Sequence, residues 1–229
     1  MNGIVKKIVS IVLLFVIAGL VYAIVQSVMQ PVNFNKQMEF RKTAGIQRMK
    51  DLRTLQEAYK SVYGRFAPSA DSLADFYKNG QMEIVMQIGS KDDSAAVANT
   101  EKLKKTHRGI TPEQMFKLYQ EGENLVFAIS SKINVKDTIF NSRKDFSIDS
   151  LRYIPYSQGD TILMEAIIKE VSGVKVPLFE AKMPYKSLLK GLDNQLRINL
   201  DADCRASNRY EGLQVGSISA PNNNAGNWE

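Results

Sequence analysis

The run from Ile8 to Met29 constrains this chain more than any other stretch. Its 22 residues carry no charge, and only Ser10, Gln26 and Ser27 are polar. A helix rises about 1.5 Å per residue, so a run of this length crosses the roughly 30 Å hydrocarbon core of a bilayer. Every backbone amide is then bonded inside the helix. We therefore predict an N-terminal transmembrane anchor over residues 1–30.

A cleaved signal peptide is the alternative interpretation of the same run. Lys6 and Lys7 precede it, and Val21 and Ala23 lie three and one positions before a possible cut. Apolar residues continue past Ala23 as far as Met29, which favours a retained anchor. Positive charges flank the run almost equally on both sides, so they do not decide its orientation. A short tail before a large domain is typical of a signal anchor, and we expect a single-pass inner-membrane protein with a periplasmic C-terminal domain.

The charge of the chain is concentrated just after the anchor. The formal net charge is +6, and residues 36–65 carry eight basic and three acidic side chains, whereas the chain beyond them is nearly neutral. The chain lacks a recognition module that combines basic and aromatic residues, which disfavours nucleic acid as a partner. We expect the basic segment to lie beside anionic lipid headgroups, with the lipid bilayer as a partner.

Residues 31–64 show the period of an amphipathic helix. Apolar residues recur there every three or four positions and form one stripe, which needs a partner protein or another copy of the chain. We expect Pro31 to kink or interrupt the helix as it leaves the membrane, and Gly64 to end it. The candidate interaction residues of this stripe are Ile46, Met49, Leu52, Leu55, Tyr59 and Val62.

Residues 65–123 are predicted as the helical region of the head. Ser69 is suited to cap a helix that stops at Gly80, and Thr111 begins a second helix with a capping box. The segment 82–88 between these helices has the composition of a strand.

Residues 124–220 are predicted as a β-rich region, followed by a flexible tail over 221–229. Alternating apolar residues indicate one antiparallel sheet, interrupted by a short helix over 186–192. The fold class is therefore α+β, with a C-terminal antiparallel sheet in the head. The predicted strands cover 125–133, 146–157, 161–171, 174–183, 196–200 and 213–218.

Residues with catalytic chemistry are scarce. The single histidine, His107, lies in a polar segment, and the single cysteine, Cys204, has no histidine nearby in the sequence. With this sole histidine in a polar segment, we expect no Ser-His-Asp triad, no Cys-His pair and no histidine-based metal site within one chain, and no glycine-rich phosphate loop occurs. We expect no enzyme and no cofactor, although scattered carboxylates leave a hydrolase with a carboxylate pair as a third hypothesis.

One calcium site is conceivable near the C-terminus. Four oxygen-bearing residues follow the predicted strand at 196–200, as a calcium loop requires. Arg205 occupies the fifth position of this segment, so its spacing differs from that of an EF-hand. A solvated turn is the alternative. The candidate ligands are Asp201, Asp203, Asn208 and Glu211.

The phrase LQEAYKSVYGRFAPSADSLADF resembles type IV pilins and type II secretion pseudopilins. In these families such a series marks the end of a long anchored helix and the start of the head, and the ending AGNWE resembles the close of the major pseudopilin, which binds calcium in a C-terminal loop. Lys7 and Ile8 stand where these families carry a membrane-embedded Glu, so we expect a related fold with a different assembly. The whole chain also resembles an uncharacterised family of singly anchored bacterial envelope proteins. The matching residues are Ala58, Tyr59, Tyr63, Gly64, Phe66, Pro68, Ser69 and Leu73.

Together these features predict a membrane-anchored, non-enzymatic envelope protein that acts through protein–protein assembly. Its partners would be copies of itself or components of a pilin-like or secretion machinery. The alternative is a membrane-tethered extracytoplasmic domain that binds a small ligand. A deep apolar pocket with convergent polar groups would favour that alternative.

Overall fold

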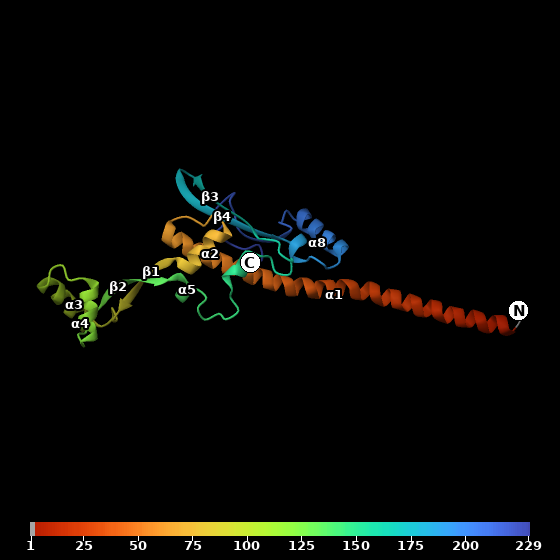
Figure 1. Cartoon of the computed structure of the whole chain (residues 1–229), viewed down its shortest axis with the longest axis horizontal. Coiled ribbons are helices and arrows are strands. Elements are labelled where there is room, and N and C mark those ends of the chain that lie inside the picture. Colours follow the sequence, from red (N-terminus) through yellow and green to blue (C-terminus); the bar gives the residue numbers. More distant parts are fainter. Residues whose placement is uncertain (1–2) are drawn as a thin grey trace. The chain divides into compact units, whose positions relative to one another are not determined.

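The computed structural model describes residues 3–229, with side chains from Val9 onward, as an α+β chain that begins with one long helix. The side chains of Lys6 and Lys7 lie outside the described part. Helix α1 runs without interruption from Gly3 to Tyr63 (Figure 1). Of the described residues, only this helix is long and apolar enough to cross a membrane.

The first half of α1 presents apolar side chains on all sides. Each large apolar residue from Val9 to Val28 is more than half exposed. An apolar surface of this size needs lipid or a protein partner. Of the two effects expected at Pro31, a kink or an interruption, the interruption does not occur, because the helix continues through this residue. Proline removes only one N–H donor, and α1 continues for many residues on both sides of it.

The chain divides into two compact units, which are described separately. Unit 1 comprises residues 1–54 and 149–229, and unit 2 comprises residues 55–148. The strands accordingly form two antiparallel sheets, one of two strands and one of three. The α+β class is confirmed, and a C-terminal antiparallel sheet is present, but the predicted strand over 125–133 belongs to the other sheet.

Unit 1 contains the three-stranded antiparallel sheet in the order β3-β4-β5. Its strands are β3 Leu163–Val171, β4 Val174–Pro184 and β5 Gly212–Gly216. The predicted turn between β3 and β4 is confirmed: Ser172 and Gly173 have φ angles of 51° and 80°.

Helix α1 packs closely against this sheet. A Cβ atom added at Gly45 would lie 2.7 Å from Leu213 Cδ1 and 3.1 Å from Met183 Sδ. One and two turns further along α1, Met49 and Leu52 are fully buried. A glycine therefore lets the helix approach the sheet, and the apolar residues that follow it form part of the unit 1 core.

The helices of unit 1 include α6 Ile148–Leu151, α7 Tyr185–Leu188 and α8 Asn194–Ala206. The predicted strand over 196–200 is therefore wrong. Asp193 caps α8 by accepting a hydrogen bond from Leu196 N at 2.9 Å, and this local signal prevails over the short apolar alternation.

The C-terminal tail, residues 221–229, was predicted to be flexible. In the structure it pairs with β5. Gly226 forms an antiparallel bridge with Val215. Asn227 N donates to Gln214 O at 2.9 Å, and Gln214 N donates to Asn227 Oδ1 at 3.0 Å. The tail therefore extends the hydrogen bonding of the sheet.

Unit 2 is built around a two-stranded ribbon. The ribbon joins α2 and α5 at one end to α3 and α4 at the other (Figure 1). The predicted caps at Ser69 and Thr111 are confirmed, and Thr111 forms a complete capping box with Gln114. The elements are α2 Ala70–Asn79, β1 Gln81–Ile88, α3 Ser94–Thr106, α4 Pro112–Gln120, β2 Phe127–Asn134 and α5 Val135–Thr138.

A small core closes the far end of the ribbon. Met115, Leu125 and Phe127 are buried together, and Leu103 of α3 and Ile88 of β1 pack against them. Four elements, α3, α4, β1 and β2, thus share one apolar cluster, which holds α3 and α4 on the ribbon.

Candidate interaction site

Most of the apolar stripe of α1 is buried against other parts of the same chain. Met49, Leu52 and Leu55 are fully buried, and Ile46 and Tyr59 are half-buried. Only Val62, at 39% exposed, remains open. Because its central residues are not accessible, the stripe itself does not provide the predicted docking surface.

Three arginines of the basic segment form hydrogen bonds with the C-terminal part of unit 1. Arg41 donates to Lys190 O at 2.8 Å and to Leu188 O at 3.3 Å. Arg48 donates to Ser150 O and to Tyr153 O, and its partial burial lowers the pKa of its guanidinium. Arg53 donates to Glu229 Oε1 at 2.7 Å and to Asn224 O at 3.3 Å. These charges therefore hold α1 to the loops and the tail of unit 1.

Aromatic residues pack together at the end of α1 in unit 2. The ring centroids of Tyr59 and Tyr63 lie 4.5 Å apart, and those of Tyr59 and Phe76 lie 5.2 Å apart. Gly64 ends the helix at a φ of 69°, as predicted. Gln56, a residue that the apolar pattern missed, is fully buried and holds the following loop through both backbone groups of Ala67.

Residues 152–162 form a loop, and its first half, 152–157, lies where the sequence predicted the end of a strand. Ser157 is buried, and its hydroxyl donates to Ile154 O at 2.7 Å and accepts from Asp160 N at 3.0 Å. Ile162 N donates to Arg152 O at 2.9 Å across the base of the loop. The buried serine supplies bonds that a strand neighbour would otherwise supply, so the segment closes on itself.

Tyr156 at the tip of this loop has an unusual backbone conformation. Its φ of 62° lies in the left-handed region, where a bulky residue is rare. Such strain persists only where the surroundings enforce it, and it is concentrated at functional positions. The Tyr156 ring lies 5.8 Å from the Phe40 ring of α1, and Arg41 Cζ lies 5.2 Å from the Tyr156 centroid.

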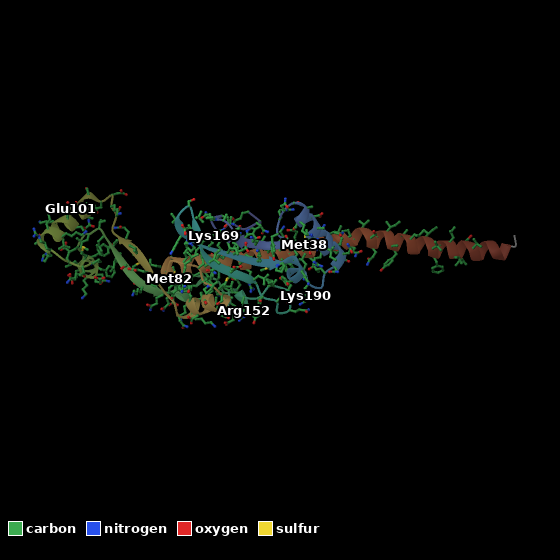
Figure 2. All side chains as sticks on the ribbon, turned by 90° about the horizontal axis from the view of Figure 1, so that it is seen from above. Met38, Met82, Glu101, Arg152, Lys169 and Lys190 are labelled. Carbon is green, nitrogen blue, oxygen red and sulfur yellow. The ribbon has the colours of Figure 1, made fainter. Side chains whose placement is uncertain are left out.

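Exposed aromatic residues thus lie on the 152–162 loop and on the adjoining part of α1, and each tyrosine has an arginine beside it. Phe40 is 62% exposed, Tyr156 45% and Tyr153 42%. Arg152 Cζ lies 5.6 Å from the centroid of the Tyr153 ring, and Arg152 is labelled in Figure 2. Tyrosine, phenylalanine and arginine are enriched in protein interfaces, and tyrosine and arginine dominate their hot spots. We call this surface the aromatic patch: Phe40, Arg41, Arg152, Tyr153 and Tyr156.

The four calcium candidates do not form a loop. Asp201 and Asp203 lie on α8, two positions apart, where side chains point in different directions. Asp201 is buried and ion-paired with Arg197, and Arg205 Nη1 lies 2.8 Å from Glu211 Oε1. Asn208 follows the helix at a φ of 51°. No cluster of three or more histidine, cysteine or acidic residues is found in the described part of the chain.

Replacing Asp201 by Asn should change how stability depends on pH. Burial raises the pKa of the Asp201 carboxyl, and its Oδ1 atom has no partner among the described residues. The folded state therefore holds a proton more tightly than the unfolded state, so this group removes stability as the pH rises from about 4 through its folded pKa. Relative to wild type, Asp201→Asn should gain stability between pH 4 and pH 7 in urea titrations. Parallel pH curves for the two proteins would contradict this.

The two residues with nucleophile or base chemistry lie in different environments. His107 is exposed at the end of α3, whereas Cys204 is buried on α8. Burial raises the pKa of the Cys204 thiol, so it stays protonated at neutral pH. A protonated, buried thiol is a poor nucleophile.

Two hollows lie in the separate units. In unit 1, a hollow of about 210 Å³ is bordered by Tyr185, Cys204 and Trp228, and burial raises the pKa of Tyr185 to about 12. The Trp228 indole N–H is buried without an acceptor within residues 9–229. In unit 2, a hollow of about 410 Å³ has an apolar floor that includes Leu103 and Leu118, with His107 at its border.

Comparison with known proteins identifies no relative. No family model, no curated protein and no solved structure matches this chain.

Proposed function

We propose that this protein is a membrane-anchored, non-enzymatic envelope protein that works by binding other envelope proteins or further copies of itself. Its anchor lies in the inner membrane and its head in the periplasm, in the manner of a pilin-like or secretion-machinery component. The observation that carries the proposal is the aromatic patch, which lies on unit 1 together with the exposed apolar half of α1.

The composition of the aromatic patch supports this function. Phe40 and Tyr156 offer large rigid rings next to Arg41, whose guanidinium is already fixed by the carbonyls of Lys190 and Leu188. Side chains that are ordered before binding lose less conformational entropy when a partner docks. The Tyr156 ring is held in turn by its contacts with the Phe40 ring and the Arg41 guanidinium.

Site-specific photo-crosslinking in intact cells tests the proposal. A benzophenone side chain at Phe40 or Tyr156 should capture a partner, seen as a larger species on a denaturing gel and identified by mass spectrometry. Val174, an exposed residue of unit 1 at the β3–β4 turn, is the matched control position and should give little product. Recovery of monomer alone from both patch positions would contradict the proposal.

Binding of a small ligand by the tethered head is the second candidate function. The hollow of about 410 Å³ in unit 2 favours it, because ligand pockets span roughly 300–1,000 Å³ and combine an apolar floor with a few polar groups. Lys102, Thr106 and Glu123 supply such groups at this hollow. A small molecule retained by the purified protein in native mass spectrometry would favour this function over assembly.

A further inference from the structure

Strand β1 carries one open edge. It pairs only with β2 in the described part of the chain, along a continuous register from Gln81↔Asn134 to Ile88↔Phe127. Val135 N donates to Gly80 O at 3.0 Å, so Gly80 faces β2. Residues that face a neighbouring strand alternate with residues that face away from it. The N–H and C=O groups on the open edge are therefore those of Gln81, Glu83, Val85 and Gln87.

Most of the usual protections of an edge strand are missing from β1. Exposed edges are normally blunted by charged side chains, above all lysine, and by proline, bulges or short length. The eight residues QMEIVMQI contain one charge, Glu83, but no lysine and no proline, and the register with β2 contains no bulge. Val85, in the middle of the edge, is 66% exposed. Such an edge is a template for pairing with another strand.

The opposite edge of the ribbon is less open. Helices α4 and α5 pack against β2, and Lys132 lies in the half of β2 nearest α5. Lysine on an edge strand opposes pairing with a further strand. Strand β1 is therefore the edge that remains available.

Strand β1 is complementary to itself in one antiparallel register. With a two-fold axis at Val85, the two valines face each other, and Glu83 faces Gln87 of the second copy. Met82 then lies opposite Ile88 of the second copy. In this register, residues whose backbone groups point outward pair with each other, and the two side chains of every pair lie on the same face of the sheet. An axis at Ile84 would set Glu83 against Val85, and an axis at Glu83 would set two carboxylates directly opposite each other, which is destabilising.

We propose that β1 pairs with β1 of a second copy of this chain, antiparallel and with the two-fold axis at Val85. The two ribbons then form one four-stranded sheet, in which the apolar faces of both copies are continuous. The interface is isologous, as in most homodimers. This inference deepens the proposed assembly function and rests on it, since anchors that share one membrane hold the copies at a high local concentration.

Cysteine crosslinking of the full-length protein in native membranes tests this register. In a Cys204→Ala background, Val85→Cys should form a disulfide-linked dimer under mild oxidation, because facing residues of a hydrogen-bonded pair have Cα atoms about 5.5 Å apart, within disulfide range. Glu83→Cys alone should stay monomeric, because two such cysteines would lie about four residues apart along the strands. Co-expressed Glu83→Cys and Gln87→Cys chains should crosslink with each other.

Two proline variants distinguish an effect on the open edge of β1 from an effect on its hydrogen bonds with β2. Val85→Pro removes an outward N–H and should lower the yield of chemically crosslinked dimer at least about tenfold while the circular dichroism spectrum stays unchanged. Ile84→Pro removes an N–H that faces β2, so it should disrupt the ribbon itself.

Two results would overturn the inference. In one, Val85→Cys stays monomeric although a benzophenone at Phe40 or Tyr156 still captures a partner. This result would overturn the β1 pairing but not the proposed function. The other is an equal dimer yield from Ser130→Cys on the β2 edge, since that indicates random collision. Absence of every crosslink overturns the proposed function as well.

Discussion

Replacing Gln56 by Leu should lower the free energy of unfolding by about 3 kcal/mol, since an unpaired buried polar group costs roughly 1–3 kcal/mol and two are created. The Gln56 amide donates to Ala67 O at 3.0 Å and accepts from Ala67 N at 2.8 Å, and both residues are fully buried. Leucine fills a similar volume but leaves both backbone groups of Ala67 without a partner. Urea denaturation of the detergent-solubilised protein, followed by circular dichroism, measures the change.

Two variants sharpen this test. Gln56→Glu keeps the shape but replaces the donor with a second acceptor facing Ala67 O, so it should also destabilise the fold at neutral pH. Thr54→Ala, at an exposed position on the same helix, should change stability by less than about 0.5 kcal/mol. If Gln56→Leu behaves like Thr54→Ala, the buried amide does not hold the loop as described.

Removing residues 1–29 should move the protein from the membrane pellet to the aqueous fraction. The deleted stretch contains the exposed apolar half of α1, in which each Leu, Ile, Phe or Val favours insertion by about 0.3–0.6 kcal/mol. Residues such as Met49 and Leu52, which pack in unit 1, are kept. Carbonate extraction and gel filtration without detergent measure the change, which should be nearly complete.

Leu14→Ile is the matched control, because it preserves the apolar character of the anchor and should stay in the pellet. A wild-type protein that is itself aqueous would contradict the retained anchor. Mass spectrometry of its mature N-terminus would then show whether cleavage after Ala23 explains the result.

Elements with strong local signals were predictable from the sequence. Ser69 and Thr111 indicate their helices by capping, Gly64 ends α1, and the strand composition of 82–88 indicates β1, all as the structure has them. In these cases a few neighbouring residues determine the conformation, so no distant contact needs to be known.

Elements whose conformation depends on distant or unusual contacts were not predictable. The segment 146–157 alternates like a strand, but the buried Ser157 folds it into the loop that presents Tyr156. The tail looked flexible because its pairing partner, Gln214, lies on a strand outside the tail. The aromatic patch joins Phe40 and Tyr156, which lie far apart in the sequence, so no local pattern could reveal it.

The division of the chain also sets an order for its folding. Unit 2 is continuous, whereas unit 1 needs two stretches that flank it. Gly45 leaves the ribosome before its neighbour Met183 by an interval on the order of ten seconds at ordinary synthesis rates. During that interval Met49 and Leu52 have no sheet to cover them, whereas all of unit 2 has already been synthesised when Met183 emerges.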